Sequence, residues 1–478
     1  MLKATIFREY DIRGIADAEL SSSDVEQLGR GLGTYIRRHS GGKKVSVGRD
    51  CRLSSTRLRD ALVKGLMGAG CEVADIGVVP TPVLYYSRLR LATDGAIMIT
   101  GSHNPPEYNG FKSMCGEETL HGHAIQDVRS LIESGDFESG DGSVRNVDVV
   151  GQYVEEIAAQ FHFARRVRIV ADAGNGTAGP VMRRIFAKLN VDAEELFFDM
   201  NGEFPNHHPD PTVPANLAHL VDAVRRNGAE LGIAFDGDAD RIGAVDEHGD
   251  VVYGDMLMLI YGREILSRTP GATFIGEVKC SQTLYDELRK AGGNPIMYKT
   301  GHSLIKAKMK QEKAALAGEM SGHMFFADRY HGYDDALYAA CRLIEIVAGS
   351  GKPLSAQLEG VPKMVSTPEI RVDTPDEVKF DVVAEVAKRF KSRYPTVDTD
   401  GVRVLFPHGW GLVRASNTQP VLVMRFEAEN AALLNEYRAE MERAVEEAKQ
   451  SLSVVAPASM HAAAAPSRNV DDHGQEQP

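Results

Sequence analysis

Short strand-like runs alternate with longer amphipathic segments along most of this chain. The first set, KKVSVG, TRLRDALVKGLMGAG, EVADIG and GAIMIT, ends at Thr100. The same order returns with VRIVADA and the segments that follow it, and once more with ATFIGEV and its successors. Such alternation is typical of α/β domains, in which parallel strands end in functional loops. We therefore expect three tandem α/β domains of related topology.

The segment from residue 363 to residue 453 has a different pattern, because strand-like runs such as VRVLFP and PVLVMRFEAE mix with two helical segments. This order predicts a separate C-terminal α+β domain. From residue 454 the chain is rich in Ala, Pro and polar residues, which predicts a disordered tail. The expected domains cover 1–148, 149–250, 251–362 and 363–453, followed by the tail at 454–478.

Composition limits the partners of the protein. Its 478 residues include 54 Lys and Arg against 67 Asp and Glu, a net charge of −13. That balance leaves no broad basic surface, so nucleic-acid binding is not expected. No uncharged apolar run reaches the about 18 residues of a membrane-spanning helix, and the N-terminal segment lacks the apolar core of a secretory signal. The five scattered cysteines favour a reducing compartment, so we expect a cytoplasmic protein without membrane contact.

One loop between two strand-like runs is rich in carboxylates. In LGIAFDGDADRIGAV, Asp236, Asp238 and Asp240 occupy alternate positions. Three carboxylates this close repel one another unless a hard divalent cation lies among them, and Mg²⁺ prefers such oxygen ligands. A calcium EF-hand is excluded, because Arg241 stands where its loop requires glycine and the flanking segments are strand-like. The loop therefore predicts a magnesium site.

A candidate nucleophile follows the strand-like run GAIMIT. In TGSHNPPEYNGFK, Ser102 lies at the expected C-terminal edge of a sheet, where α/β proteins bind ligands. Lys112 supplies a cation in the same segment. A hydrolase nucleophile elbow is not indicated, because neither TGSHN nor the later GEMSGH fits the pattern G-x-S-x-G.

Two further loops carry groups that bind sugars and phosphates. In GEMSGH, Glu319, Ser321 and His323 alternate, which suits a row of substrate hydroxyls. The segment WGLVRASNTQP sets a fork-shaped donor and hydroxyl groups in a turn between two strands, which suits a phosphate. The residues of this turn are Arg414, Ser416, Asn417 and Thr418. The cations of other loops that could join an anion site are Arg13, Arg241 and Lys279.

The segment DAGNGTAG presents an alternative function. Gly174, Gly176 and Gly179 match G-x-G-x-x-G after a strand-like run, and Asp199 follows about 20 residues later. This is the pattern of an NAD-dependent oxidoreductase, an alternative from a different enzyme class. It leaves the acidic loop and the Ser102 loop unexplained, whereas a tight turn between strand and helix explains the glycines without a cofactor.

Taken together, YDIRG, TGSHNPPEYNGFK, DGDADR, GEMSGH and RASNTQP resemble, in this order, the motifs of the α-D-phosphohexomutases. The resemblance covers nearly the whole chain before the tail and looks closest to the bacterial phosphomannomutase/phosphoglucomutase branch. It implies three related α/β domains and a TATA-binding-protein-like C-terminal domain around a central cleft. It also implies an enzyme that interconverts the 1-phosphates and 6-phosphates of mannose and glucose. A reorienting hexose 1,6-bisphosphate would be the intermediate, with glucose 1,6-bisphosphate as activator.

The same resemblance assigns a role to each motif. Ser102 would be the phosphoserine and would hold Mg²⁺ together with Asp236, Asp238 and Asp240. The residues around the transferring phosphoryl group would be Arg13, His103, Lys112 and Arg241. Those that line the sugar site would be Tyr10, Lys279, His302, Glu319, Ser321 and His323. The non-reacting phosphate would be held by Arg414, Ser416, Asn417 and Thr418.

Several points stay open at this stage. A base must take the proton of the attacking hydroxyl, and both Lys112 and His323 are candidates. Phosphoglucosamine mutase is the nearest alternative within the family, which typically has GEQSGH where this chain has Met320. A sugar-phosphate binding protein without turnover is a non-catalytic alternative, although Ser102 and the three aspartates are all present. Small sugar phosphates are the expected partners of a protein that we expect to be a monomer.

Overall fold

The computed structural model describes residues 2–417 and 419–455. The chain divides into two compact units, residues 1–363 and residues 364–478. Within the described residues, no helix is both long enough and apolar enough to cross a membrane. The tail expected from residue 454 begins with the last two residues of a helix, and residues 456–478 lie outside the described part of the chain.

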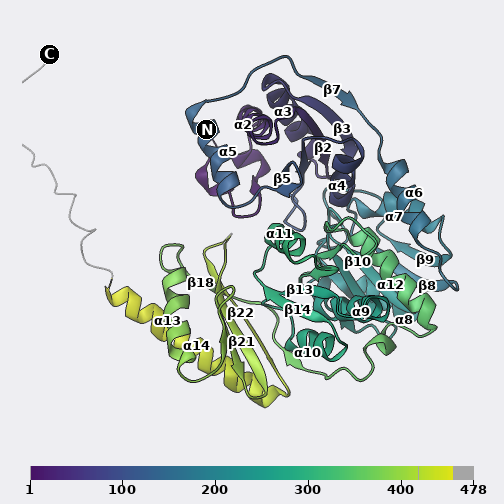
Figure 1. The fold of residues 1–478 in the computed structure, drawn as a ribbon, viewed down its shortest axis with the longest axis vertical. Coiled ribbons are helices and arrows are strands. Elements are labelled where there is room, and N and C mark those ends of the chain that lie inside the picture. Colours follow the sequence, from purple (N-terminus) through teal and green to yellow (C-terminus); the bar gives the residue numbers. More distant parts are fainter. Residues whose placement is uncertain (1, 418, 456–478) are drawn as a thin grey trace, which may run out of the picture. The chain divides into compact units, whose positions relative to one another are not determined.

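The first block of unit 1 is a mixed sheet with helices on both faces (Figure 1). Its strands are β1 (Ile12–Ile15), β2 (Lys44–Arg49), β3 (Glu72–Val78), β4 (Gly95–Ile99), β5 (Tyr108–Cys115), β6 (Glu118–Thr119) and β7 (Ser143–Asn146). Its helices are η1 (Ala4–Ile6), α1 (Ala16–Glu19), α2 (Ser22–Ser40), α3 (Ser55–Gly68), α4 (Thr81–Arg90) and α5 (His123–Ser134). On β4, Ala96 and Met98 share a core with α4, whereas Ile97 and Ile99 share one with α2 and α3. The apolar run of β4 therefore buries both faces of the sheet.

The second block has a smaller sheet. Its strands are β8 (Val167–Asp172), β9 (Val191–Leu196), β10 (Leu231–Phe235), β11 (Ile242–Asp246) and β12 (Val251–Val252). Its helices are α6 (Val150–Gln160), α7 (Ala178–Phe186), η2 (Pro214–Leu217) and α8 (Ala218–Asn227). The helix α8 ends at Gly228, whose φ of +60° is the left-handed conformation that glycine adopts without strain.

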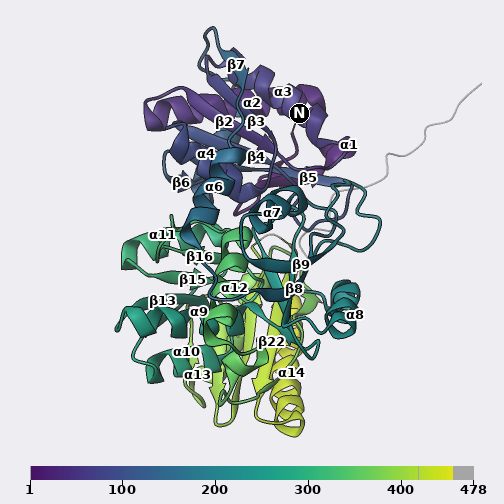
Figure 2. The same cartoon turned by 90° about the vertical axis from the view of Figure 1, so that its right-hand side faces the viewer.

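The third block completes unit 1. Its strands are β13 (Thr273–Glu277), β14 (Asn294–Tyr298), β15 (Leu316–Gly318) and β16 (Met324–Phe326). Its helices are α9 (Gly254–Arg268), α10 (Gln282–Lys290), α11 (His302–Glu312), α12 (Ala336–Ser350) and η3 (Ser355–Leu358). Helix α12 contacts β8 and β11 of the second block as well as β16 of its own, and Figure 2 shows it beside β8. The second and third blocks therefore share one core.

The three blocks share one strand order. In the first it is β5-β4-β2-β3, in the second β11-β10-β8-β9, and in the third β16-β15-β13-β14. Of these four strands in each block, the first three along the chain run parallel and the fourth is antiparallel to the third. The prediction of three α/β blocks with related topology is confirmed.

Unit 2 is an antiparallel sheet with two helices. Its strands are β17 (Val365–Ser366), β18 (Ile370–Asp373), β19 (Thr396–Val397), β20 (Val402–Phe406), β21 (Gly409–Ala415) and β22 (Val421–Ala428). Its helices are α13 (Lys379–Lys391) and α14 (Ala431–Val455). Val404 on β20, Val413 on β21 and Met424 on β22 lie in one core with apolar residues of both helices. This mixture of strands and helices confirms the expected α+β class of the C-terminal part.

Candidate functional site

The same turn of each block contributes to the candidate active site. The turn from the third to the fourth strand forms the serine loop (residues 100–107), the acidic loop (236–241) and the sugar loop (319–323). These turns follow the carboxyl ends of parallel strands, the edge at which α/β proteins bind ligands. Direct contacts join the three loops. Ser102 Oγ lies 2.9 Å from Asp236 Oδ2, and His323 Nε2 lies 3.4 Å from Asp240 Oδ1.

Ser102 is presented by an unusual backbone conformation. Its φ is +49°, in the left-handed region that residues other than glycine seldom adopt. The residue is 2% exposed, and its hydroxyl donates to Asp236 and lies 3.1 Å from Nδ1 of His103. Burial, followed by the charges of Arg241 and Arg13, lowers the pKa of His103 well below its ordinary range. A neutral imidazole therefore lies beside the hydroxyl.

The three aspartates of the acidic loop are fully buried, and oxygens of all three lie within 4.8 Å of one another. Burial, with the charges of Asp240 and Asp238, raises the pKa of Asp236 well above its ordinary range. Burial acts the same way on Asp240, but Lys112 and His323 hold its pKa well below the ordinary range. Oδ1 of Asp238 and Oδ1 of Asp240 have no hydrogen-bond partner among the described residues. Buried carboxylate oxygens that accept no hydrogen bond fit a hard divalent cation, so this cluster could hold one.

Lys112, on β5, reaches the acidic loop from the first block. Its Nζ lies 2.7 Å from Asp238 Oδ2 and also pairs with Asp240. Burial opposes its charge, but Asp238 and Asp240 raise its pKa, so the ammonium stays protonated. Thr81, the first residue of α4, donates its hydroxyl to Asp238 Oδ2 at 2.6 Å. Sequence reasoning missed Thr81, because nothing local links it to a carboxylate 157 positions away.

The sugar loop is organised by a carboxylate–imidazole pair. Glu319 Oε2 lies 2.7 Å from Nδ1 of His323, and Oε1 accepts the N–H of Gly301 at 2.8 Å. Burial lowers the pKa of His323, but Asp240 and Glu319 outweigh it and raise this pKa to about 9. Against the effect of burial, His323 lowers the pKa of Glu319 to about 2. The hydroxyl of Ser321 lies 3.3 Å from His323 Nδ1.

Two arginines join the loops. The backbone N–H of Arg241 donates to Asp236 Oδ1 at 3.1 Å, and its Nε donates to His323 Nε2 at 3.3 Å. Arg13, on β1, donates to the side-chain oxygen of Asn104 in the serine loop at 2.5 Å. Each arginine thus lies beside a loop that carries candidate catalytic groups.

Of the other expected sugar-site residues, His302 lies beside His323 and Tyr10 lies beside His302. The rings of His302 and His323 are stacked with centroids 5.6 Å apart, and the ring of Tyr10 meets His302 edge-on at 6.4 Å. The hydroxyl of Tyr10 donates to the carbonyl of Thr300 at 2.9 Å. Lys279, two residues beyond β13, is buried.

The residues expected to bind the second phosphate belong to unit 2. Arg414 lies on β21 rather than in the turn that follows it, which corrects the expected placement. Lys379 Nζ donates to the backbone carbonyl of Ser416 at 2.6 Å and fixes the start of that turn. Asn417 comes next, and Thr418 lies outside the described residues.

The glycine-rich segment DAGNGTAG packs against the acidic loop. A carbon added at Gly176 would lie 2.6 Å from the carbonyl oxygen of Gly237, and the N–H of Thr177 donates to the same oxygen at 3.0 Å. A carbon at Gly179 would lie 2.1 Å from the carbonyl oxygen of Phe198. The glycines therefore permit close contacts within the chain. The alternative of an NAD-binding turn is not favoured.

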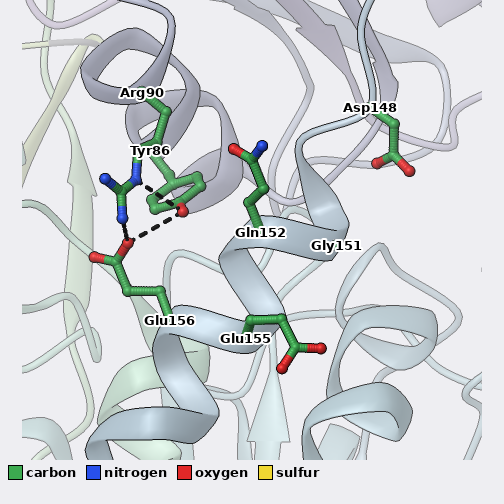
Figure 3. Close-up of a pocket in the computed structure, with 7 residues that line it drawn as sticks. All are labelled: Tyr86, Arg90, Asp148, Gly151, Gln152, Glu155 and Glu156. Carbon is green, nitrogen blue, oxygen red and sulfur yellow. Dashed lines mark hydrogen bonds and ion pairs between the residues drawn. The ribbon is translucent and has the colours of Figure 1, made fainter.

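A surface hollow of about 960 Å³ lies between α4 and α6 (Figure 3). Its lining residues are Tyr86, Arg90, Asp148, Gly151, Gln152, Glu155 and Glu156. Arg90 is already paired with Glu156, which also accepts the hydroxyl of Tyr86 at 3.1 Å. The lining is mainly acidic and includes no expected site residue, so the hollow does not suit a sugar phosphate.

Comparison with known sequences identifies the family to which these blocks and unit 2 belong. Four profiles of the phosphoglucomutase/phosphomannomutase family match the chain in order. Residues 4–139, 151–249 and 253–365 match alpha/beta/alpha domains I, II and III, and residues 369–444 match the C-terminal domain. The matches thus extend over all three loops and over residues 369–444 of unit 2.

Individual relatives agree with these profiles. The chain is 44% identical over 429 residues to a phosphomannomutase/phosphoglucomutase of Pseudomonas aeruginosa, which covers 90% of this chain and 92% of the relative. It is 42% identical to a phosphoglucomutase of Neisseria gonorrhoeae, over 90% of this chain and 94% of the relative.

The phosphoglucomutase/phosphomannomutase family protein from Burkholderia thailandensis, known from a crystal structure, is 45% identical in sequence to this chain. It has a TM-score of 0.88 and covers 94% of this chain and 98% of that one. An Aspergillus fumigatus N-acetylphosphoglucosamine mutase solved with GlcNAc-6P and magnesium is 14% identical, with a TM-score of 0.61. The match covers 92% of this chain and 96% of that one. At this identity the likeness shows the fold alone. These relatives favour neither phosphoglucosamine mutase nor oxidoreductase for this chain. The chain belongs to the α-D-phosphohexomutase family and is an isomerase of the phosphomannomutase/phosphoglucomutase type.

Proposed function

We propose that this protein interconverts the 1-phosphates and 6-phosphates of mannose and glucose through a phosphoserine at Ser102. The observation that supports this most directly is the 2.9 Å contact between the Ser102 hydroxyl and Asp236, next to oxygens of Asp238 and Asp240 that accept no hydrogen bond in the described part of the chain. A serine that exchanges phosphoryl groups needs an oxygen lone pair that can reach phosphorus, and it needs cations nearby. The four side chains offer the oxygen ligands for one such cation.

Mg²⁺ is the cation that we propose for Ser102 and the three aspartates. When bound there, it would neutralise negative charge on the transferring phosphoryl oxygens. Arg13 on β1, Lys112 on β5 and Arg241 in the acidic loop are the protein's own cations beside these groups, and they would hold the remaining charge. His103, neutral and 3.1 Å from the serine oxygen, would orient that oxygen.

The proton of the attacking sugar hydroxyl goes to His323 in this proposal. The bond between phosphorus and the serine oxygen breaks while a bond to the sugar oxygen forms, and the sugar hydroxyl loses its proton. Only the neutral form of His323 can take this proton: Glu319 accepts from Nδ1–H and leaves Nε2 as the accepting atom, and with a pKa of about 9 this form is the minor one near neutral pH. Lys112 suits the role less well, because two carboxylates hold its ammonium group. In the second half-reaction the oxygen of Ser102 attacks the other phosphate of the bisphosphate, the bond from that phosphorus to the sugar oxygen breaks, and His323 returns its proton to the departing sugar oxygen.

Substrate recognition follows from the remaining proposed residues. Glu319 and Ser321 would bind the sugar's O3 and O4, with Tyr10, Lys279 and His302 around them. The non-reacting phosphate would be held by Arg414, Ser416, Asn417 and Thr418. Glucose 1,6-bisphosphate would be both intermediate and activator. We also propose the domain limits 1–148, 149–250, 251–362 and 363–453, a monomer, and a cytoplasmic location, which the cysteine usage of the chain supports.

Turnover of different hexose 1-phosphates tests this function. Glucose and mannose differ at C2 alone, so contacts to O3 and O4 serve both sugars. Galactose inverts O4 and would leave buried polar groups without partners, which can reduce turnover by about 10⁴-fold in a site built around that bond. We expect a coupled assay to give comparable turnover of glucose and mannose 1-phosphates and little of galactose 1-phosphate. Equal turnover of galactose and mannose 1-phosphates would refute the assignment of the sugar loop.

A further inference from the structure

One buried arginine holds the serine loop from the side opposite the acidic loop. Arg52 lies in the turn between β2 and α3, and its side chain is 0% exposed. Its two terminal nitrogens donate to four backbone carbonyls, those of Ser102 (2.8 Å), Asn104 (2.6 Å), Pro105 (2.6 Å) and Tyr108 (3.0 Å). A guanidinium offers five N–H donors in a fixed plane, whereas a lysine ammonium could not reach four such separated oxygens.

The fifth donor of Arg52 is fixed by a buried carboxylate. Nε of Arg52 lies 3.1 Å from Oδ2 of Asp50, which also accepts the N–H of Gly101 at 3.1 Å. The other oxygen of Asp50 accepts the backbone N–H of Arg52 at 3.0 Å and the hydroxyl of Ser55 at 2.5 Å. All five donors of the guanidinium therefore have acceptors. A buried ion pair with its hydrogen bonds satisfied holds one geometry, because breaking any bond leaves a buried polar group unpaired.

The serine loop is shaped to receive this guanidinium. A carbon added at Gly101 would lie 2.5 Å from both Cζ and Nε of Arg52, so only glycine fits before the serine. On the other side, a carbon at Gly237 of the acidic loop would lie 2.6 Å from the carbonyl oxygen of Ser102. That carbonyl is thus enclosed between Arg52 and the acidic loop. The left-handed φ of Ser102 is a strained conformation that persists only where the surroundings hold it.

We propose that Arg52 is a positioning residue for phosphoryl transfer, whose guanidinium holds Ser102 in its left-handed conformation with the hydroxyl directed at Asp236. The inference rests on the proposed function, in which Ser102 gives up and regains a phosphoryl group in every cycle. The serine must return to one position for both half-reactions, and Arg52 fixes the backbone that carries it. Arg52 acts through carbonyl oxygens and has no contact with the hydroxyl itself. Its loss should therefore change the rate of transfer and leave sugar binding unchanged.

The test compares Arg52→Lys with Arg57→Lys. Arg57 is a matched control on α3, because it also donates to backbone carbonyls, those of Leu20 at 2.9 Å and Ala16 at 3.0 Å, but lies outside the serine loop. A displacement of the reacting group by about 1 Å can reduce the rate about 100-fold. We expect Arg52→Lys to lower kcat by about that factor, with KM for glucose 1-phosphate changed less than about threefold. Arg57→Lys should retain wild-type kcat.

A second measurement separates positioning from folding. The rate at which glucose 1,6-bisphosphate phosphorylates Ser102, followed by intact mass, should fall in Arg52→Lys together with kcat, while circular dichroism stays that of the wild type. In Arg52→Ala, added guanidinium ion should restore part of the activity, which a merely structural lesion would not show. Should Arg52→Lys fail to fold, Asp50→Asn decides, because it keeps the volume and removes the charge that orients the guanidinium.

The outcomes distinguish this inference from the proposed function. Wild-type kcat and wild-type phosphorylation of Ser102 in folded Arg52→Lys, or in Asp50→Asn where that variant decides, would overturn the role of Arg52 alone. An equal loss in Arg57→Lys would also overturn it. A wild-type protein that neither isomerises hexose phosphates nor takes up phosphate on Ser102 would instead refute the proposed function.

Discussion

At the residue scale, the charges around one serine hydroxyl determine what the site can bind. Three buried carboxylates face it, and burial with mutual repulsion raises the pKa of Asp236 well above its ordinary range. Lys112 neutralises part of this charge through Asp238 and Asp240. Among the described residues, the carboxylate oxygens that accept no hydrogen bond, Oδ1 of Asp238 and Oδ1 of Asp240, are the ones that a divalent cation would bind most favourably.

Replacing Asp238 by Asn tests the metal site. One anionic ligand becomes neutral, so we expect the affinity for Mg²⁺, measured by titration calorimetry, to fall at least about tenfold, and kcat with it. Relief of carboxylate repulsion should keep or raise the unfolding temperature in metal-free buffer. Asp246→Asn is the control, since Asp246, at the end of β11, accepts N–H groups of the next turn, between β11 and β12. That variant should lose stability and keep Mg²⁺ binding. Wild-type Mg²⁺ affinity in Asp238→Asn would contradict the metal site.

The sequence could predict the residues whose meaning is local. Asp236, Asp238 and Asp240 stand at alternate positions, and Ser102 follows an apolar strand, so both motifs indicate their chemistry without the fold. Arg52 and Thr81 could not be predicted in this way. Their partners lie 50 to 56 and 157 positions away, and a single Arg or Thr after a strand has no distinctive spacing.

At the element scale, the equivalent turn of the three blocks forms three different loops, the serine loop, the acidic loop and the sugar loop. The first three of the four strands that the blocks share run parallel, so the turn that leaves the third of them emerges at the ligand-binding edge of the sheet. The alternation of strands and helices predicted the blocks, because apolar periodicity reports burial directly. It did not predict that the glycines of DAGNGTAG support the acidic loop, because the contact with Gly237 depends on tertiary packing.

Gly176→Ala tests that support. The added carbon would lie 2.6 Å from the carbonyl oxygen of Gly237, so the acidic loop must shift. We expect Mg²⁺ affinity to fall about tenfold, because the ion demands near-ideal ligand geometry. Gly179→Ala, which meets Phe198 instead, should lower the unfolding temperature without changing Mg²⁺ affinity. Equal Mg²⁺ affinity in both variants would show that the turn does not support the metal site.

The N-terminus of α12 carries a pH-dependent contribution to stability. Asp335 accepts the N–H of Tyr338 and the hydroxyls of Tyr153 and Tyr330, but burial outweighs these bonds and raises its pKa from 3.8 to about 6. The folded state therefore holds this proton more tightly than the unfolded state. The resulting stability is complete below about pH 4 and is lost as the pH rises through 6, a change of up to about 3 kcal/mol.

Asp335→Asn should abolish that contribution, because an amide keeps the acceptor oxygen and does not ionise. Thermal unfolding of both proteins between pH 4.5 and 8 measures the effect. We expect the wild type to lose stability relative to the variant as the pH rises through about 6. A constant difference between the two midpoints across this range would show that Asp335 does not titrate in the folded protein.

At the scale of the whole molecule, the proposed function would draw on residues of both units of the chain. The reacting groups lie in unit 1, and the proposed phosphate clamp at Arg414 lies in unit 2, where its Nε donates to Asp400 at 2.9 Å. The chain divides after Lys363, within the segment 360–367 that we propose as a hinge. Both isomers would place their non-reacting phosphate on the same arginine and present opposite ends to Ser102.

Arg414→Ala should therefore raise KM for 1-phosphate and 6-phosphate substrates alike and release more bisphosphate during turnover. A lysine at this position should restore only part of the loss, because a point charge cannot reproduce the bidentate fork. ³¹P NMR during turnover measures the released bisphosphate. Arg389→Ala is the control, since Arg389 forms a pair with Glu447 on the helices of the same unit. A KM increase for only one substrate, without extra bisphosphate, would contradict a shared clamp.

The phosphorylation state of Ser102 during a single turnover tests the central claim most directly. Protein phosphorylated with glucose 1,6-bisphosphate and freed of it is mixed with glucose 1-phosphate, quenched, and analysed by peptide mass mapping alongside the bisphosphate formed. The account predicts one bisphosphate for each phosphate lost from Ser102, and neither event in Ser102→Ala. Isomerisation at the wild-type rate by protein that never carries phosphate on Ser102 would contradict it.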